Sequence, residues 1–331
     1  MNLLIVFFFW GFCQATSIPL SKDNPEINYQ NVIFEYQLED FSYAHYNQAV
    51  KQLFAIFESK LSKRIGPGPK RKVGLKIYTA SGYGLSTPKA LVVSVINQLE
   101  GRGFSKNEIF IIDEDSYNLR QSGFLPPLSH GGDTFEGVKV HSFDEDIHWD
   151  SDWHYISSLP SRQAFSRVSF QEDRTKSYLP VTLMTDADFW INLPMVTSHE
   201  STCVSGALTN ATIFNINNNR RFIHNPINAA IAIAEIAAIP EVQETLIFTL
   251  LSLESYQFID GTNFNARYTK SEPILWLSMN APAIDYLMYE KINHCRKNAN
   301  LPIFEEIPYF FAYCKSLNVG DYTDTSIIKL K

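Results

Sequence analysis

Four polar segments of this chain carry side chains that can bind or activate a small ligand. The first is the loop from Thr79 to Lys89, in which two glycines precede Ser86 and Thr87. A loop of glycines and hydroxyls ahead of a helix presents backbone N–H groups to a phosphate or a carboxylate. Ser86 and Thr87 are therefore candidate substrate-binding residues, although a tight turn with an ordinary helix cap explains them as well. The spacing matches neither a P-loop nor a dinucleotide fingerprint.

The second segment places His199 shortly after a predicted strand, among Thr and Ser residues. A neutral imidazole there can bind a metal ion or transfer a proton, so His199 is both a candidate catalytic residue and a candidate metal ligand. A histidine that only makes hydrogen bonds within the structure is an equal alternative. The segment has no G-x-S-x-G elbow, which argues against a serine hydrolase.

The third segment contains Arg220, Arg221 and His224. Paired guanidinium groups hold a carboxylate or a phosphate in forked geometry, which makes both arginines candidate substrate-binding residues. His224 is a candidate catalytic residue and metal ligand. The competing interpretation is a polar loop that caps the next helix at Asn225.

The fourth segment contains Asp260, and Asp285 follows later in the chain. Carboxylates that follow strands suit metal binding or base catalysis, so Asp260 is a candidate metal ligand and Asp285 a candidate catalytic residue. Asp260-Gly261 is also a common turn, and the spacing does not decide between these interpretations.

Alternating strands and helices must position these segments. Apolar residues at 73–78 and 108–113 flank a helix predicted from Pro88 to Leu99, with Thr87 as its N-cap and Pro88 at its first position. A strand, a helix and a strand in this order describe a βαβ unit. The other predicted elements are helices at 44–63, from about Ser201, at 226–239 and at 282–293, and strands at 138–143, 188–193, 246–251 and 274–277.

This order of elements predicts an α/β fold with a mixed, largely parallel sheet flanked by helices, Rossmann-like and doubly wound. Residues 73–331 are predicted to form this domain, and residues 16–72 a lead-in and a helix ahead of it. Residues 116–178 are the least regular part, which predicts an inserted lobe. Ligands of such sheets bind at the carboxyl ends of the strands, where the four segments lie.

Five motifs in a fixed order resemble the bacterial domain-of-unknown-function 362 family. The motifs are Val73–Ile77 with Ser86-Thr87-Pro88, then Asp188–Pro194, His199, Gly206–Asn210, and Arg221–His224 with Asp285. The resemblance covers about residues 72–298, implies an α/β fold and adds Asn210 as a candidate substrate-binding residue. The family's two motif lysines are absent, because Val196 and Thr197 precede His199 and Thr209 precedes Asn210. The cysteine-rich segment of many relatives is absent too.

Composition limits the classes of partner. The formal net charge of −7 argues against a nucleic-acid-binding protein.

The N-terminus indicates export. Met1 to Ala15 has no charged side chain and an apolar run of signal-peptide length, so we expect cleavage after Ala15 and export to the periplasm or the exterior. No later segment is apolar and long enough to predict a membrane helix. Without C-x-x-C pairs we expect no iron–sulfur cluster, while Cys295 and Cys314 are candidates for a disulfide.

Two functions are compatible with these residues. One is an enzyme that acts on a small anionic substrate, with a divalent metal as its candidate cofactor. The alternative is a non-catalytic ligand-binding protein of the cell envelope, suggested by the loss of the two motif lysines.

Overall fold

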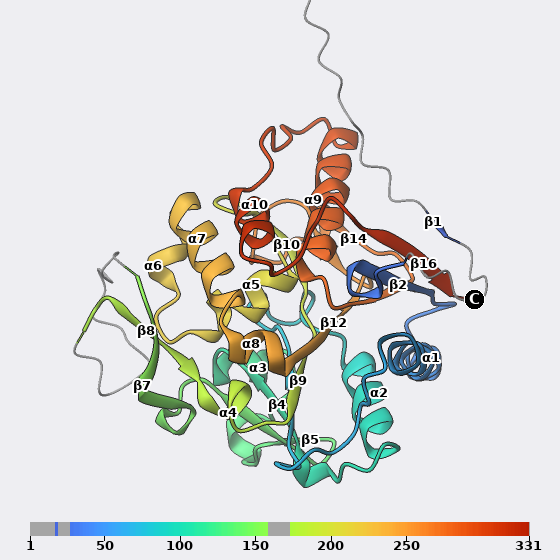
Figure 1. The fold of residues 1–331 in the computed structure, drawn as a ribbon, viewed down its shortest axis with the longest axis vertical. Coiled ribbons are helices and arrows are strands. Elements are labelled where there is room, and N and C mark those ends of the chain that lie inside the picture. The colour runs from blue at the N-terminus through green and yellow to red at the C-terminus, as the bar shows by residue number, and fades with distance from the viewer. Residues whose placement is uncertain (1–16, 19–26, 158–172, 331) are drawn as a thin grey trace, which may run out of the picture.

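A sheet of ten strands runs through the molecule, which we describe from a computed structural model over residues 17–18, 27–157 and 173–330 (Figure 1). The strand order is β1 (Ser17–Ile18), β16 (Ser326–Leu330), β2 (Val32–Gln37), β15 (Ile274–Ser278), β12 (Leu246–Ser252), β9 (Phe189–Asn192), β3 (Val73–Lys76), β4 (Ile109–Asp113), β6 (Val138–Ser142) and β5 (Thr134–Phe135). Six neighbouring pairs are parallel and three are antiparallel. The predicted α/β class with a mixed, largely parallel sheet is confirmed.

Helices cover both faces of this sheet. On one face lie α1 (Tyr43–Leu61) and α2 (Lys89–Glu100), whose apolar side chains share a core with Leu75, Ile111 and Ile191 of the sheet. Apolar residues three and four apart on α1 form its buried stripe, as the sequence predicted. The other face is covered by α5 (Ala207–Ala211), α7 (Pro226–Ala237), α9 (Ala281–Asn298) and α10 (Tyr309–Ser316). The shorter helices are α3 (Ser116–Gln121), α4 (Val181–Met184), α6 (Arg220–Ile223) and α8 (Pro240–Thr245).

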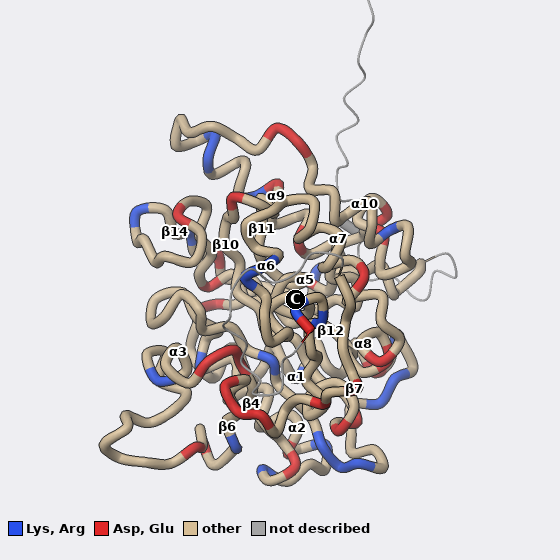
Figure 2. The backbone as a smooth tube through the Cα atoms, turned by 90° about the vertical axis from the view of Figure 1, so that its left-hand side faces the viewer, with Lys and Arg blue, Asp and Glu red and all other residues tan. Residues whose placement is uncertain are grey.

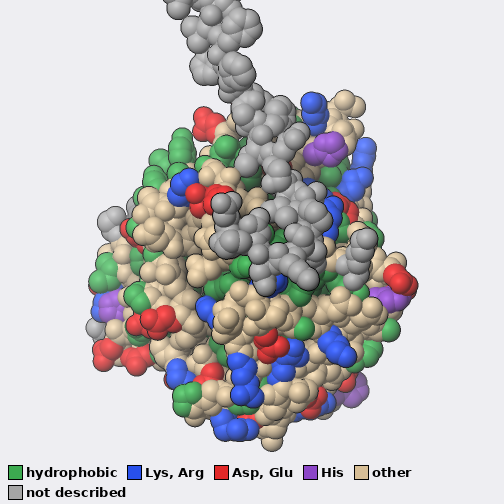
Figure 3. All heavy atoms as spheres, turned by 45° about the vertical axis from the view of Figure 1, so that its right-hand side comes forward, with side chains coloured by type: hydrophobic (Ala, Val, Ile, Leu, Met, Phe, Trp, Pro, Cys, Tyr) green, Lys and Arg blue, Asp and Glu red, His purple; other side chains and the backbone are tan. Residues whose placement is uncertain are grey.

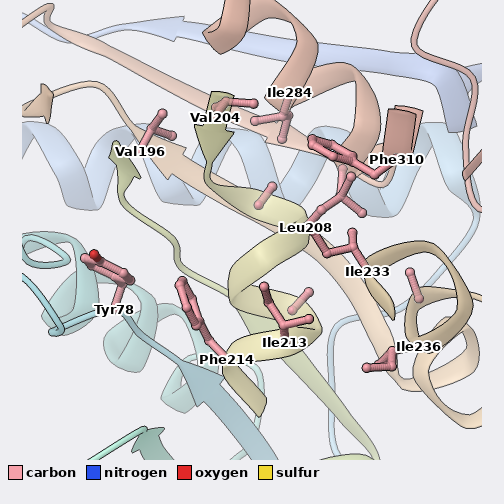
Figure 4. Packing of buried hydrophobic residues seen from close by; sticks show 14 of the residues in the cluster. Tyr78, Val196, Val204, Leu208, Ile213, Phe214, Ile233, Ile236, Ile284 and Phe310 are labelled. Atoms are coloured by element: carbon pink, nitrogen blue, oxygen red, sulfur yellow. The ribbon is translucent and has the colours of Figure 1, made fainter. Parts of the chain in front are cut away.

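The short helix α5 lies at the centre of the second core. Leu208 projects from it toward Ile284 of α9, Phe310 of α10 and Ile233 of α7 (Figure 4). These four side chains are at most 1% exposed. A one-turn helix has little stability of its own, so its position depends on this packing.

Two smaller sheets complete the fold. One contains β11 (Cys203–Ser205), β10 (Val196–His199), β13 (Tyr256–Gln257) and β14 (Thr269–Lys270), and the other pairs β7 (Trp149–Ile156) with β8 (Lys176–Pro180). In the chain, β10 follows β9 and β13 follows β12. Because β9 is parallel to β12 and β10 is parallel to β13, the four-stranded sheet lies beyond the carboxyl ends of the main strands.

Two local predictions are wrong. The helix expected near Ser201 is instead the hairpin of β10 and β11, because Cys203, with a φ of 59°, turns the chain back before α5 begins. Thr87 is not the N-cap of α2. Pro88 occupies that position, and α2 has no hydrogen bond from its N-terminal N–H groups to a capping side chain.

The predicted boundaries also change. Strand β2, ahead of residue 73, lies between β16 and β15 inside the main sheet, so the N-terminal part is more than a lead-in and a helix. Within the expected inserted lobe, β6 belongs to the main sheet and β7 and β8 stand apart from it. Residues 158–172 of that lobe and the predicted signal peptide at 1–15 lie outside the described residues.

In the described part of the chain, none of the helices combines the length and the apolar character needed to cross a membrane. Cys295 and Cys314 are both buried and both free thiols, so they do not form the disulfide considered above. Acidic and basic side chains are interspersed on the face seen in Figure 3, so their charges largely offset one another there.

Candidate functional site

A row of polar side chains crosses the main sheet where the parallel strands end. Lys76, Asn192, Thr249 and Ser278 are register partners on β3, β9, β12 and β15. Register partners on neighbouring strands face the same side of a sheet. All four are at most 1% exposed, so the row is buried beneath α5.

The ammonium group of Lys76 organises this row. It donates to Asp113 Oδ1 at 2.6 Å, to Asn210 Oδ1 at 2.9 Å and to the Ile77 carbonyl at 2.9 Å, which uses all three of its protons. The second oxygen of Asp113 accepts from Thr79 Oγ1 at 2.6 Å. Desolvation offsets much of the attraction in a buried ion pair, but removal of either partner leaves an uncompensated charge.

Asn210, a predicted substrate-binding residue, belongs to this buried network. Its Nδ2 donates to Asn192 Oδ1 at 2.8 Å, and Asn192 Nδ2 donates to the Ala207 carbonyl at 2.8 Å and to Thr249 Oγ1 at 3.1 Å. Asn210 has no exposed surface. Its amide therefore holds α5 on the sheet and does not face a ligand.

Asp285, a predicted catalytic residue, caps α5 from inside the core. Its two oxygens accept from the N–H groups of Ala207 at 2.6 Å and Leu208 at 2.8 Å. Burial raises the pKa of Asp285 to about 7, although the hydrogen bonds from the two N–H groups lower it. A Cβ on Gly206 would lie 2.4 Å from Asp285 Oδ1, so this approach requires glycine.

The predicted anion loop is only partly available. Thr87 Oγ1 accepts from the Tyr78 N–H at 2.8 Å and donates to the Leu193 carbonyl at 2.6 Å, which joins the loop to the end of β9. Thr87 is 1% exposed. Ser86 is half-buried in the loop that precedes α2.

The two arginines have different surroundings. Arg221 donates to the carbonyls of Arg174 at 2.9 Å and Thr175 at 3.0 Å and to Ser177 Oγ at 2.6 Å, so it binds the start of β8. Burial lowers the pKa of Arg221 to about 10. Arg220 is exposed at the start of α6.

His199 and His224 are both accessible to solvent to some degree. His199 is half-buried at the end of β10, and its Nδ1 accepts from the Ser201 N–H at 3.2 Å. Burial lowers the pKa of His199, while the neighbouring Glu200 raises it and the charge of His224 lowers it. His224 is exposed at the end of α6.

Asp260 is an exposed turn residue, with a φ of 71° and a hydrogen bond from Asn265 Nδ2 at 2.7 Å. Although the adjoining Gly261 lies against the Ser198 carbonyl, His199, His224 and Asp260 do not come together at metal-binding distances. Asp285 lies beside Gly206, close to Val196 at the other end of β10 from His199. Three residues of strand separate those ends by about 10 Å.

The structure thus places His199, His224 and Arg220 at or near the surface, and Asn210, Asp285 and Thr87 in the interior. The sequence analysis missed Lys76, Asp113 and Asn192. The available signal was a lysine within an otherwise apolar predicted strand, because a charge in a buried strand requires a partner.

Replacement of Lys76 tests the network. We expect Lys76→Met to lower the free energy of unfolding by about 3–5 kcal/mol, because Asp113 is left buried and unpaired. The double variant Lys76→Met/Asp113→Asn should regain part of that loss. Urea unfolding at pH 7 measures both. Lys51→Met, at an exposed position, is the control, and its free energy of unfolding is expected within about 0.5 kcal/mol of that of the parent chain. An equal loss of stability in Lys76→Met and Lys51→Met would contradict this role of Lys76.

The pH dependence of stability tests Asp285. Its folded pKa of about 7 exceeds the pKa near 4 of an unfolded aspartate, so the folded state binds more protons between these values. The free energy of unfolding should therefore fall relative to that of Asp285→Asn as the pH rises from about 4 to 7, by up to about 4 kcal/mol, and level off above. Urea unfolding at several pH values measures the difference. Asp260→Asn serves as the exposed control, and a difference that is constant with pH would count against the buried carboxyl.

No protein-family model matches the chain, and no curated protein matches it. Among solved structures, the chain is similar to a protein from Thermotoga maritima determined by the Northeast Structural Genomics Consortium, with 12% sequence identity and a TM-score of 0.44. The similarity covers 78% of this chain and 59% of that protein, so the chain spans less than two thirds of that neighbour's length. The resemblance to the domain-of-unknown-function 362 family stays a prediction.

Proposed function

We propose that the protein binds a small anionic ligand at a surface site made of Arg220, His199 and His224, here termed the cationic rim after the guanidinium of Arg220, and that it acts as a ligand-binding protein. The sequence leaves two functions open, an enzyme and a binding protein. The burial of the other candidate residues favours the binding protein. Asp285, Asn210 and Thr87 use their polar atoms for internal hydrogen bonds. A catalytic base must reach the proton that it removes, and a carboxyl group inside the core does not reach a ligand at the surface.

The arrangement of the rim supports an anion as the ligand. Arg220 and His224 are four residues apart at the two ends of α6, which places them on one face of that turn. His199 is included as the third group because the charge of His224, like that of Glu200, influences its pKa. An exposed guanidinium offers its forked donors to a carboxylate or a phosphate, and imidazole N–H groups add single donors.

An enzyme with a divalent metal at the predicted ligands is the weaker proposal. His199, His224 and Asp260 are not within metal-binding distance as a set. Asp260 instead accepts from Asn265 within its own turn.

Anion titration tests the rim. We expect inorganic phosphate or citrate to bind the purified chain, and Arg220→Gln and His224→Gln each to weaken binding about fivefold, because an exposed polar contact to the anion contributes about 1 kcal/mol. Isothermal titration calorimetry at low salt measures the affinity, which should fall as salt is added. The exposed Arg64→Gln is the matched control. Absence of binding, or equal binding by the double variant Arg220→Gln/His224→Gln, would remove the proposal.

We further propose that the protein is exported, with the envelope or the exterior as its location. The support is the uncharged, apolar segment that ends at Ala15. The mature chain is then expected to begin at Thr16, which intact-mass measurement and N-terminal sequencing of protein recovered outside the cytoplasm would show. A chain that retains Met1 inside the cytoplasm would contradict export.

A further inference from the structure

A set of metal-binding side chains lies at the end of β6, apart from the cationic rim. His141, Glu145 and His148 each offer a ligand atom, and these atoms all lie within 4.8 Å of one another. His141 is on β6, and the chain then turns through a short 3-10 helix, Asp146–His148, stabilised by N–H bonds from Glu145 to the Ser142 carbonyl and from His148 to the Glu145 carbonyl. This turn brings the histidines and the glutamate of the sequence H-x-x-x-E-x-x-H close together in space.

Two imidazole nitrogens at this point lack hydrogen bonds. His148 Nε2 and His141 Nδ1 are buried, and neither has a hydrogen-bond partner among the described residues. His148 has no exposed surface at all. A buried polar atom without a partner is unfavourable, so two such nitrogens beside one carboxylate point to a site for a ligand.

The surroundings hold both rings in an orientation suited to binding. His148 Nδ1 lies 3.0 Å from Thr182 Oγ1 of α4, and when this nitrogen donates to the hydroxyl, Nε2 keeps its lone pair. The His141 and His148 ring centroids are 5.0 Å apart, and Phe110 and Phe143 pack against the two rings. Burial lowers the pKa of His148 to about 4 and, with the charge of Lys139, lowers that of His141.

We propose that His141, Glu145 and His148 bind one zinc-class divalent ion, a site that lies outside the function proposed above. Two nitrogens and one carboxylate oxygen suit Zn²⁺ or a similar transition metal, whereas Mg²⁺ and Ca²⁺ select sets made only of oxygen. Ligands of a tetrahedral zinc ion are about 3.4 Å apart. Glu145 Oε2 and His148 Nε2 are already 3.9 Å apart, and the Glu145 side chain is 58% exposed and free to rotate.

Three protein ligands leave one tetrahedral position open. Because His148 is buried and Glu145 is exposed, solvent reaches the three residues from the Glu145 side. A water molecule or an anionic group of a small ligand fits there. Acidic positions gather around α3, β4 and β6, the part of the molecule that holds the site, and attract cations toward it (Figure 2).

Zinc binding by matched variants tests the site. The full chain, stripped with EDTA and then given zinc sulfate alone, should retain one zinc per chain after gel filtration, measured by elemental analysis. Glu145→Gln should weaken zinc binding at least tenfold in competition with a chelator, because one of three ligands loses its charge. Asp146→Asn, an exposed acid on the same turn, should stay within about twofold. Since Glu145 is exposed, its variant should fold, which circular dichroism verifies.

Cobalt supplies a second measurement that reports geometry. Co²⁺ in the parent chain should give the strong visible absorption of a tetrahedral site, which His141→Ala should abolish. Thr182→Val should weaken zinc binding about tenfold, and Thr182→Ser should keep it near the parent value, because serine retains the hydroxyl that accepts from His148 Nδ1. Zinc retained equally by Glu145→Gln and His141→Ala, or lost on His199→Ala instead, would overturn the assignment.

Discussion

The buried charge of Lys76 is the constraint on which the central architecture depends. An ammonium group with no exposed surface is stable only while its three protons stay bonded, here to Asp113, Asn210 and the Ile77 carbonyl. These partners come from β4, from α5 and from the chain just after β3. The ion pair therefore fixes the ends of two parallel strands and the helix above them in one arrangement.

The helix α5 extends this arrangement into the second core. It is one turn long, so its position comes from its partners: Asn192 below it, Asp285 at its first N–H groups and apolar side chains from three other helices around it. The polar side chains at the carboxyl ends of the central strands make hydrogen bonds to one another and to α5, and these bonds stabilise the fold. The groups left for the proposed anion lie farther out, on the hairpin of β10 and β11 and on α6.

The two proposed sites relate differently to this centre. The cationic rim lies on short outer elements, which suits the exchange of a solvated anion. The histidine and glutamate site is attached directly to the main sheet, because His141 is in register with Ile112 of β4, next to Asp113. The strand that carries Asp113 thus also positions a metal-binding imidazole, and rigid placement of this kind favours a metal ion with strict geometry.

The sequence by itself determined the α/β class, the first βαβ unit and the helices at α1, α7 and α9, because these depend on apolar periodicity and on local caps. It also named His199, His224 and Arg220. It did not show that Asp285, Asn210 and Thr87 face inward, that β2 and β16 join the sheet, or that His141, Glu145 and His148 meet. Only the tertiary structure decided these points, because burial and the pairing of polar atoms arise from contacts between residues far apart in the chain, and residue type and spacing do not encode which way such a side chain faces.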